Sequence, residues 1–161
     1  MELIYIGKIT STHGIKGELK IKSNFEYKDK VFEIGNKLVI DNKEYIIKSY
    51  RSHKGFDMVT LNDYKDINEV LFLINKKVYI YKDNSNINDI VLDEELVKYD
   101  VIINNEVGSI EEIFFASPNN KIIRVLINNK EVLVPFNKEF IKKIDKDKKK
   151  IDIEIIDGMI L

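Results

Sequence analysis

Apolar and polar side chains alternate along much of this 161-residue chain. A period of two is typical of β-strands, because successive side chains point to opposite faces of a sheet. In the first half, the alternating runs are residues 3–9, 18–23, 37–40, 44–50, 57–61 and 77–81. Turn-forming residues such as Asp41-Asn42-Lys43 separate these runs and predict hairpins between them. Residues 1–83 are therefore predicted to form a small β domain.

The period changes once within this first half. Ile67, Val70, Leu71 and Ile74 follow the spacing i, i+3, i+4, i+7, which predicts one face of a helix. Asp66 is expected to cap this helix, with Glu69 three residues later as the partner in a capping box.

A polar, turn-rich stretch around residues 82–89 indicates a boundary between domains. We place the linker at 84–93 and a second β domain at 94–161. Its alternating runs include residues 101–103, 107–115, 121–127 and 131–134, separated by turns rich in asparagine. Short strands at even spacing predict a small barrel or sandwich in each half, and a barrel leaves no unpaired edge strand.

Composition supports a folded chain with two differently charged halves. Hydrophobic residues make up 44% of the chain and the net charge is -1, which argues against a protein held on nucleic acid mainly by bulk positive charge. Residues 1–83 hold 15 basic and 12 acidic side chains, whereas residues 84–161 hold 11 and 15. There is no cysteine and no long apolar run, so we expect a cytoplasmic protein that does not associate with membranes.

The loop between the first two predicted strands is rich in glycine and in basic side chains. Gly7, Gly14 and Gly17 suit places where the backbone turns sharply or another backbone comes close. The basic side chains of this region are Lys8, His13, Lys16 and Lys20. From the residues alone, two interpretations stay equally open: a barrel corner, or a contact surface on a stiff loop.

Catalytic and metal-binding motifs are absent from the sequence: it holds no HExxH, Walker, GxSxG or GxGxxG pattern. The two histidines, His13 and His53, could meet in a barrel, but no further ligands stand at a recognisable spacing. We therefore expect no metal and no cofactor. In the adjacent pair Phe114-Phe115, one ring should face the core and the other outward, either as an anchor for a protein partner or covered by another layer.

Several longer segments resemble one known family. These are Ile6-Gly7-Lys8-Ile9 with His13-Gly14-Ile15-Lys16-Gly17-Glu18-Leu19-Lys20, Lys65–Val70 with Val78-Tyr79-Ile80, Val107-Gly108-Ser109-Ile110-Glu111-Glu112-Ile113, Val132-Leu133-Val134-Pro135-Phe136, and Asp157-Gly158-Met159-Ile160-Leu161. In this order they are similar to the bacterial ribosome maturation factor RimM family over nearly the whole chain.

The resemblance implies a mainly β fold with one or two short helices. A six-stranded barrel similar to those of translation factors would precede a PRC barrel. It also implies a non-catalytic assembly factor of the small (30S) ribosomal subunit. Such a factor binds small-subunit ribosomal protein number nineteen in the subunit head, acts near 16S rRNA, and assists head maturation and efficient 16S rRNA processing. We expect it to be a monomer without cofactors.

Residues 91–98 depart from the family pattern, because the aromatic pair associated there with subunit binding is replaced by Val91 and Leu92. Tyr99 is the candidate substitute. The predicted contact residues are therefore Lys8, His13, Lys16, Lys20, Tyr99, Phe114 and Phe115, and the predicted structural turn residues are Gly7, Gly14, Gly17 and Gly108. Two alternatives remain: a PRC-barrel interaction module with a non-ribosomal partner, and an enzyme resembling a flavin-type reductase on the first barrel.

Overall fold

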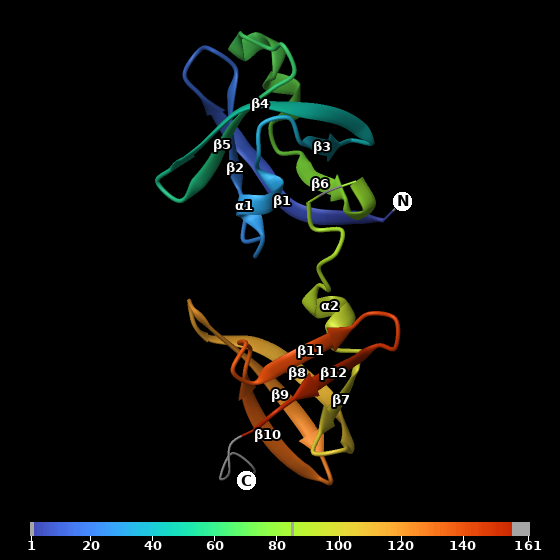
Figure 1. Ribbon diagram of the computed structural model, residues 1–161. Helices are drawn as coiled ribbons and strands as arrows, with labels where there is room; N and C mark the ends of the chain where they lie inside the picture. The colour runs from blue at the N-terminus through green and yellow to red at the C-terminus, as the bar shows by residue number, and fades with distance from the viewer. Residues whose placement is uncertain (1, 85, 156–161) are drawn as a thin grey trace. The chain divides into compact units, whose positions relative to one another are not determined.

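The computed structural model describes residues 2–84 and 86–155. The chain separates into two compact units, Met1–Ile90 and Val91–Leu161 (Figure 1). The division falls inside the predicted linker, whose bounds at 84 and 93 stay a prediction. Residues 156–161 lie outside the described part, and they include the C-terminal segment, residues 157–161, that resembles the family. No helix among the described residues is long and apolar enough to cross a membrane.

The first unit is a closed six-stranded barrel. Its strands follow the order β1-β2-β5-β4-β3-β6 around the barrel, so that β6 closes it against β1. The strands are β1 (Leu3–His13), β2 (Glu18–Lys22), β3 (Lys37–Ile40), β4 (Lys43–His53), β5 (Phe56–Leu61) and β6 (Lys77–Tyr81). A short helix, α1 (Lys28–Val31), follows β2, and a 3-10 helix, η3 (Lys82–Asn84), follows β6.

The alternating pattern forms this barrel because its apolar positions point inward. Ile9, Leu19, Ile21, Leu38 and Ile47 are fully buried. Burial of such side chains contributes about 1.5–3 kcal/mol each relative to exposure. The polar partners of the alternation, including most lysines, are left on the outside.

The segment predicted as one helix forms two consecutive 3-10 helices instead, η1 (Ile67–Glu69) and η2 (Leu71–Leu73). Asp66 does cap η1, because its side chain accepts a hydrogen bond from the backbone N–H of Asn68. The Glu69 side chain accepts one from the N–H of Lys65, one residue before the cap. Val70 and Leu73 are buried, but Leu71 is 46% exposed, so the apolar positions do not form one continuous buried face.

The second unit is a six-stranded sheet in the order β10-β9-β8-β7-β12-β11 (Figure 1). Its elements are α2 (Asp93–Leu96), β7 (Asp100–Ile103), β8 (Glu106–Ser117), β9 (Asn120–Ile127), β10 (Lys130–Pro135), β11 (Ile141–Asp145) and β12 (Lys150–Ile153). Neighbouring strands are antiparallel except β7 and β12, which pair in parallel. Apolar side chains from these strands and α2 form one core that includes Leu96, Val101, Ile123, Val132 and Ile151. The predicted fold class, mainly β with two β domains, is confirmed.

Candidate functional site

The loop between β1 and β2 is a tightly held turn. His13 and Glu18 are paired across its base, and Gly14 and Gly17 adopt φ values of 70° and 85°. Such positive φ values are favourable for glycine and unfavourable for most other residues. The loop also contacts η1, because the backbone N–H of Ile67 donates a 2.9 Å hydrogen bond to the Ile15 carbonyl. Gly14 and Gly17 therefore lie where the turn requires them.

The predicted contact residues His13 and Lys16 lie together at this turn. They line a pocket of about 420 Å³ with Gly14, Ile15, Glu18 and Thr60. The His13 ring lies 5.4 Å from the ring of His53, which reaches it from the end of β4. In residues 2–84 and 86–155, no three His, Cys, Asp or Glu side chains are grouped so that they could hold a metal ion.

A bidentate ion pair joins this turn to β4. Arg51 donates hydrogen bonds of 2.8 and 2.7 Å to the two carboxylate oxygens of Glu18. The Arg51 bonds hold the pKa of Glu18 below its usual value, although partial burial acts in the opposite direction. The same bonds raise the pKa of Arg51. Glu18 is thus committed to Arg51, which leaves the neighbouring lysines as the side chains able to meet an anion.

The surroundings of His53 disfavour its charged form. Loss of solvent around the ring is the main cause that lowers the pKa of His53, and the positive charges of Arg51 and Lys54 lower it further. An unperturbed histidine titrates near pH 6.5. The surroundings therefore favour the neutral form of His53, in which one ring nitrogen donates a hydrogen bond and the other accepts one.

Lys20 follows the turn on β2 and already has a neighbour. Its ammonium lies 4.1 Å from the centre of the Phe56 ring, within the range of a cation–π interaction. Lys16, in contrast, is exposed at the turn itself. The two lysines that the sequence grouped together therefore differ in environment.

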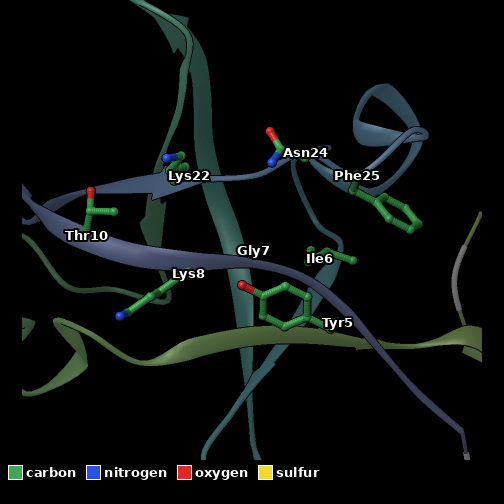
Figure 2. A pocket seen from close by; sticks show the side chains of 8 residues that line it. All are labelled: Tyr5, Ile6, Gly7, Lys8, Thr10, Lys22, Asn24 and Phe25. Carbon is green, nitrogen blue, oxygen red and sulfur yellow. The ribbon is translucent and has the colours of Figure 1, made fainter. Parts of the chain in front are cut away.

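Lys8 lies at a second pocket, lined by a different set of residues. This pocket of about 410 Å³ is formed by Tyr5, Ile6, Gly7, Lys8, Thr10, Lys22, Asn24 and Phe25. Figure 2 shows β1 crossing the view, with Tyr5 and Lys8 on it and with Lys22, Asn24 and Phe25 on the segment beside it. The structure thus divides the predicted basic cluster into two sites: His13 and Lys16 at the turn, and Lys8 at this pocket.

Two of the predicted turn glycines lie inside strands. Gly7 belongs to β1, and an added Cβ would lie 2.7 Å from the carbonyl oxygen of Lys22. Gly108 belongs to β8, and an added Cβ would lie 2.7 Å from the carbonyl oxygen of Leu126. At both positions the reason for glycine is a close neighbouring backbone, not a turn.

Of the adjacent aromatic residues Phe114 and Phe115, one lies as expected and the other does not. Phe115 is 53% exposed, in agreement with one outward ring. Phe114 is only half-buried, lies outside the core, and has the guanidinium carbon of Arg124 5.3 Å from its ring centre. The expectation that one ring of the pair fills the core is therefore wrong. A bulge in β8 between Ile110 and Glu112 changes which residues face inward.

Tyr99 is buried, at 6% exposure, within the core of the second unit. It is a packing residue, and the prediction that it replaces the aromatic pair at the surface is therefore wrong. Leu92 is also buried and Val91 packs against the same core. The replacement of an aromatic pair by Val91 and Leu92 therefore places aliphatic side chains at the edge of a hydrophobic core.

Sequence reasoning missed Tyr5, Phe25 and Lys77 beside Lys8, and it considered Lys22 only as one of several lysines near the opening loop that could meet the rRNA backbone. A sequence signal exists only for Tyr5, in a break of the alternation at the start of the chain, because strand pairing brings Lys22 and Lys77 to this region. Tyr5 and Lys8 are both exposed although three positions separate them, and a strict period of two would place them on opposite faces.

Comparisons with known proteins agree along the chain. The model of the RimM N-terminal domain matches residues 4–85, and that of the RimM PRC barrel domain matches residues 93–159. Curated proteins named ribosome maturation factor RimM, from Staphylococcus aureus strains JH9 and Newman, are each 33% identical to it over 169 residues, covering 98% of both chains.

Two solved structures are also similar. A RimM crystal structure from Pseudomonas aeruginosa has a TM-score of 0.49 and 19% identity, covering 96% of this chain and 98% of that one. The solution structure of the RimM N-terminal domain from Thermus thermophilus has a TM-score of 0.46 and 16% identity, covering 52% of this chain and 94% of that one. Because the sequence matches extend over both units in order, this chain belongs to the RimM family of ribosome maturation factors.

Proposed function

We propose that this chain is a non-catalytic, cytoplasmic assembly factor of the small ribosomal subunit that acts as a monomer. It would bind small-subunit ribosomal protein number nineteen and nearby 16S rRNA in the subunit head, and assist head maturation and 16S rRNA processing. The observation that carries this proposal is the family match over both units to proteins named ribosome maturation factor.

The charges of the two halves support different partners for the two units. Residues 84–161 hold four more acidic than basic side chains, which suits a basic ribosomal protein because complementary charge steers encounter. Phe115 offers an exposed aromatic anchor on the same unit, and aromatic anchors are common at the centres of interfaces. Residues 1–83 have a basic excess that suits the rRNA backbone.

The protein-binding part is tested by capture of small-subunit head proteins on the purified full-length chain. Phe115→Ser should reduce the recovered head protein, while Leu133→Ser serves as a matched control, because Leu133 is a 44% exposed apolar residue on β10. Recovery of no small-subunit protein by the native chain would favour an interaction module with another partner. Equal loss in both variants would remove Phe115 from the interface.

The RNA-binding part is tested on immature small subunits. Replacing Lys16 and Lys20 by Ala should weaken binding more at low salt than at high salt, because phosphate contacts are screened as salt rises. Lys37→Ala is the control, since Lys37 is already paired with Glu44 at 3.4 Å on another part of the barrel. Unchanged affinity at every salt concentration would exclude this role for the turn.

A further inference from the structure

Three lysines form a row across the outer face of the first barrel. Lys8 on β1 is the direct partner of Lys22 on β2 and of Lys77 on β6. Residues directly opposite each other in neighbouring strands present their side chains on the same face. All three lysines are exposed. The row therefore concentrates positive charge on three adjacent strands.

No acidic side chain neutralises this row within residues 2–84. The ion pairs of the barrel involve other lysines, such as Lys76 with Asp41 and Lys28 with Asp57. Like charges directly opposite in a sheet are destabilising. An arrangement that costs stability and has no internal counter-charge is typical of a surface that meets an anion.

The pocket beside this row exists because of a bulge. The pairing of β1 with β6 shifts register between Tyr5 and Gly7, so that Tyr5 and Lys8 both point outward while Ile6 stays buried. Gly7 lies between them and also lines the pocket, and its missing Cβ lets the backbone of β2 approach closely at this point. The volume of about 410 Å³ is within the range of about 300–1,000 Å³ found for small-molecule sites.

Aromatic rings form part of the pocket wall. Tyr5 is 52% exposed, and its ring packs edge-on against Tyr79 at 5.7 Å. Phe25 lies at the opposite end of the pocket from Lys8 and Thr10 in Figure 2, and its ring packs edge-on against Tyr27 at 5.9 Å. Each ring thus packs against another aromatic side chain, which helps to fix its position.

A buried serine fixes the chain that carries Phe25. The Ser23 hydroxyl donates a hydrogen bond to the Ile6 carbonyl and accepts one from the backbone N–H of Phe25 at 3.2 Å. Ser23 is only 6% exposed, so these bonds are shielded from water. The two walls of the pocket are therefore held together before any ligand arrives.

We propose that this pocket binds an unstacked nucleotide of single-stranded RNA, with the base against Tyr5 and Phe25 and the adjoining phosphates on Lys8, Lys22 and Lys77. Single-stranded RNA is recognised by aromatic stacking of splayed bases together with a basic track for the backbone. Asn24, next to Phe25 in the chain, supplies an amide that can hydrogen-bond the edge of a base. This inference rests on the rRNA-binding part of the proposed function and names a site for it.

An acidic peptide fits the same observations less well, because its carboxylates could meet the lysine row but would leave the exposed Tyr5 ring and the Phe25 ring of the pocket without a planar base to stack on. Duplex RNA is also disfavoured, because its bases stay stacked and cannot enter the pocket.

The test measures binding of a fluorescent oligouridylate of about ten nucleotides, a length within the site sizes of single-strand binders, to the full-length chain by anisotropy over a range of salt concentrations. Tyr5→Leu should weaken binding by about 5- to 150-fold, the range expected for loss of one stacked base, with an unchanged salt slope. Phe72→Leu is the matched control, because Phe72 is a 54% exposed ring on η2, outside the pocket.

The lysine row is tested separately, through the salt slope. Lys8→Gln and Lys22→Gln should each reduce the slope of log K against log salt by about 0.7, the value for one phosphate contact on a single strand. Lys43→Gln, on the β3–β4 hairpin, should leave the slope unchanged. Thermal unfolding of each variant shows whether it is folded. If Tyr5→Leu does not fold, the lysine variants still test the proposal.

The proposal is overturned if Tyr5→Leu binds like Phe72→Leu, if duplex RNA binds as tightly as the single strand, or if polyglutamate displaces the oligonucleotide at equal charge. Its failure is distinct from that of the proposed function. Loss of oligonucleotide binding with intact association to small subunits would exclude the pocket alone. Oligonucleotide binding by a chain that associates with no small subunit would exclude the assembly role alone.

Discussion

The Tyr50 hydroxyl donates a 2.7 Å hydrogen bond to Oδ1 of Asp57, a carboxylate buried at 3% exposure in the barrel. The other oxygen of Asp57 lies 2.9 Å from the ammonium of Lys28 in α1. The Tyr50 ring stacks on Phe32, which follows α1. Asp57 thus links β5 to β4 and to the segment that crosses from β2 to β3.

This link predicts a loss of stability in alkali. Burial, with a smaller contribution from Asp57, raises the pKa of Tyr50 to about 12 from its usual 10.0. Between these values the unfolded chain releases the phenol proton and the native protein keeps it, so stability falls as pH rises. Denaturant unfolding at pH 9 to 12 should therefore show a smaller loss for Tyr50→Phe than for the native chain. Equal losses would contradict the assignment.

Asp57→Asn should destabilise the first barrel by about 1.5–3 kcal/mol, the usual contribution of hydrogen bonds to a charged group. The substitution removes the charge that faces Lys28, while the size of the side chain is kept. Asp63→Asn is the control, because the Asp63 side chain is 96% exposed and its ion pair with Lys48 is long, at 4.0 Å. Urea unfolding of the three proteins measures the difference, and equal midpoints for all three would contradict the role of Asp57.

Gly7 and Gly14 should respond differently to substitution. Gly7→Ala places a Cβ 2.7 Å from a backbone oxygen, so β1 and β2 must separate, at a cost of about 1–3 kcal/mol. Around Gly14 an added Cβ would meet nothing within 4 Å, and only the positive φ is unfavourable. Gly14→Asn should therefore be well tolerated, since asparagine accepts this conformation. Thermal unfolding ranks the two variants, and the opposite order would refute the explanation.

Arg51→Gln should raise the pKa of Glu18. The largest cause of its lowered pKa is the Arg51 hydrogen bond, and partial burial would then act with less opposition. A carboxyl-carbon NMR titration of Glu18 measures the shift directly. Because the lowered pKa stabilises the fold above the unfolded value of 4.5 and this contribution is lost as pH falls, the variant should also lose less stability on acidification. An unchanged Glu18 titration would contradict the pairing.

The fold class could be predicted from the sequence because the alternation survives wherever a strand buries one face. It holds in β9, where Ile123, Val125 and Ile127 point inward in turn. The helix over residues 67–74 could not be predicted correctly, because the same spacing of apolar residues suits two 3-10 turns. The hydrogen bond from Ile67 to the Ile15 carbonyl, a tertiary contact, is a feature that the pattern does not contain.

The two sites differ in how far sequence could indicate them. His13 and Lys16 stand close together in the chain and lie close together in space, so the turn was visible as a basic, glycine-rich motif. The pocket at Tyr5 and Lys22 depends on a register shift and on strand pairing across the barrel. For Tyr99 the sequence indicated a surface residue where the structure has a buried one. An aromatic residue near a domain boundary gives no sign in the sequence of whether its ring points to solvent or to the core.

In each unit the first strand pairs with a strand near the end of that unit, and this pairing sets the order in which the units fold during synthesis. The first barrel closes through β1 and β6, so all its strands are available once residue 81 has been made. In the second unit, β7 has to wait for its parallel partner β12, which ends at residue 153. Domains generally fold as units, with the N-terminal one first. The lysine row on β1, β2 and β6 would thus be assembled while the strands of the second unit are still being translated.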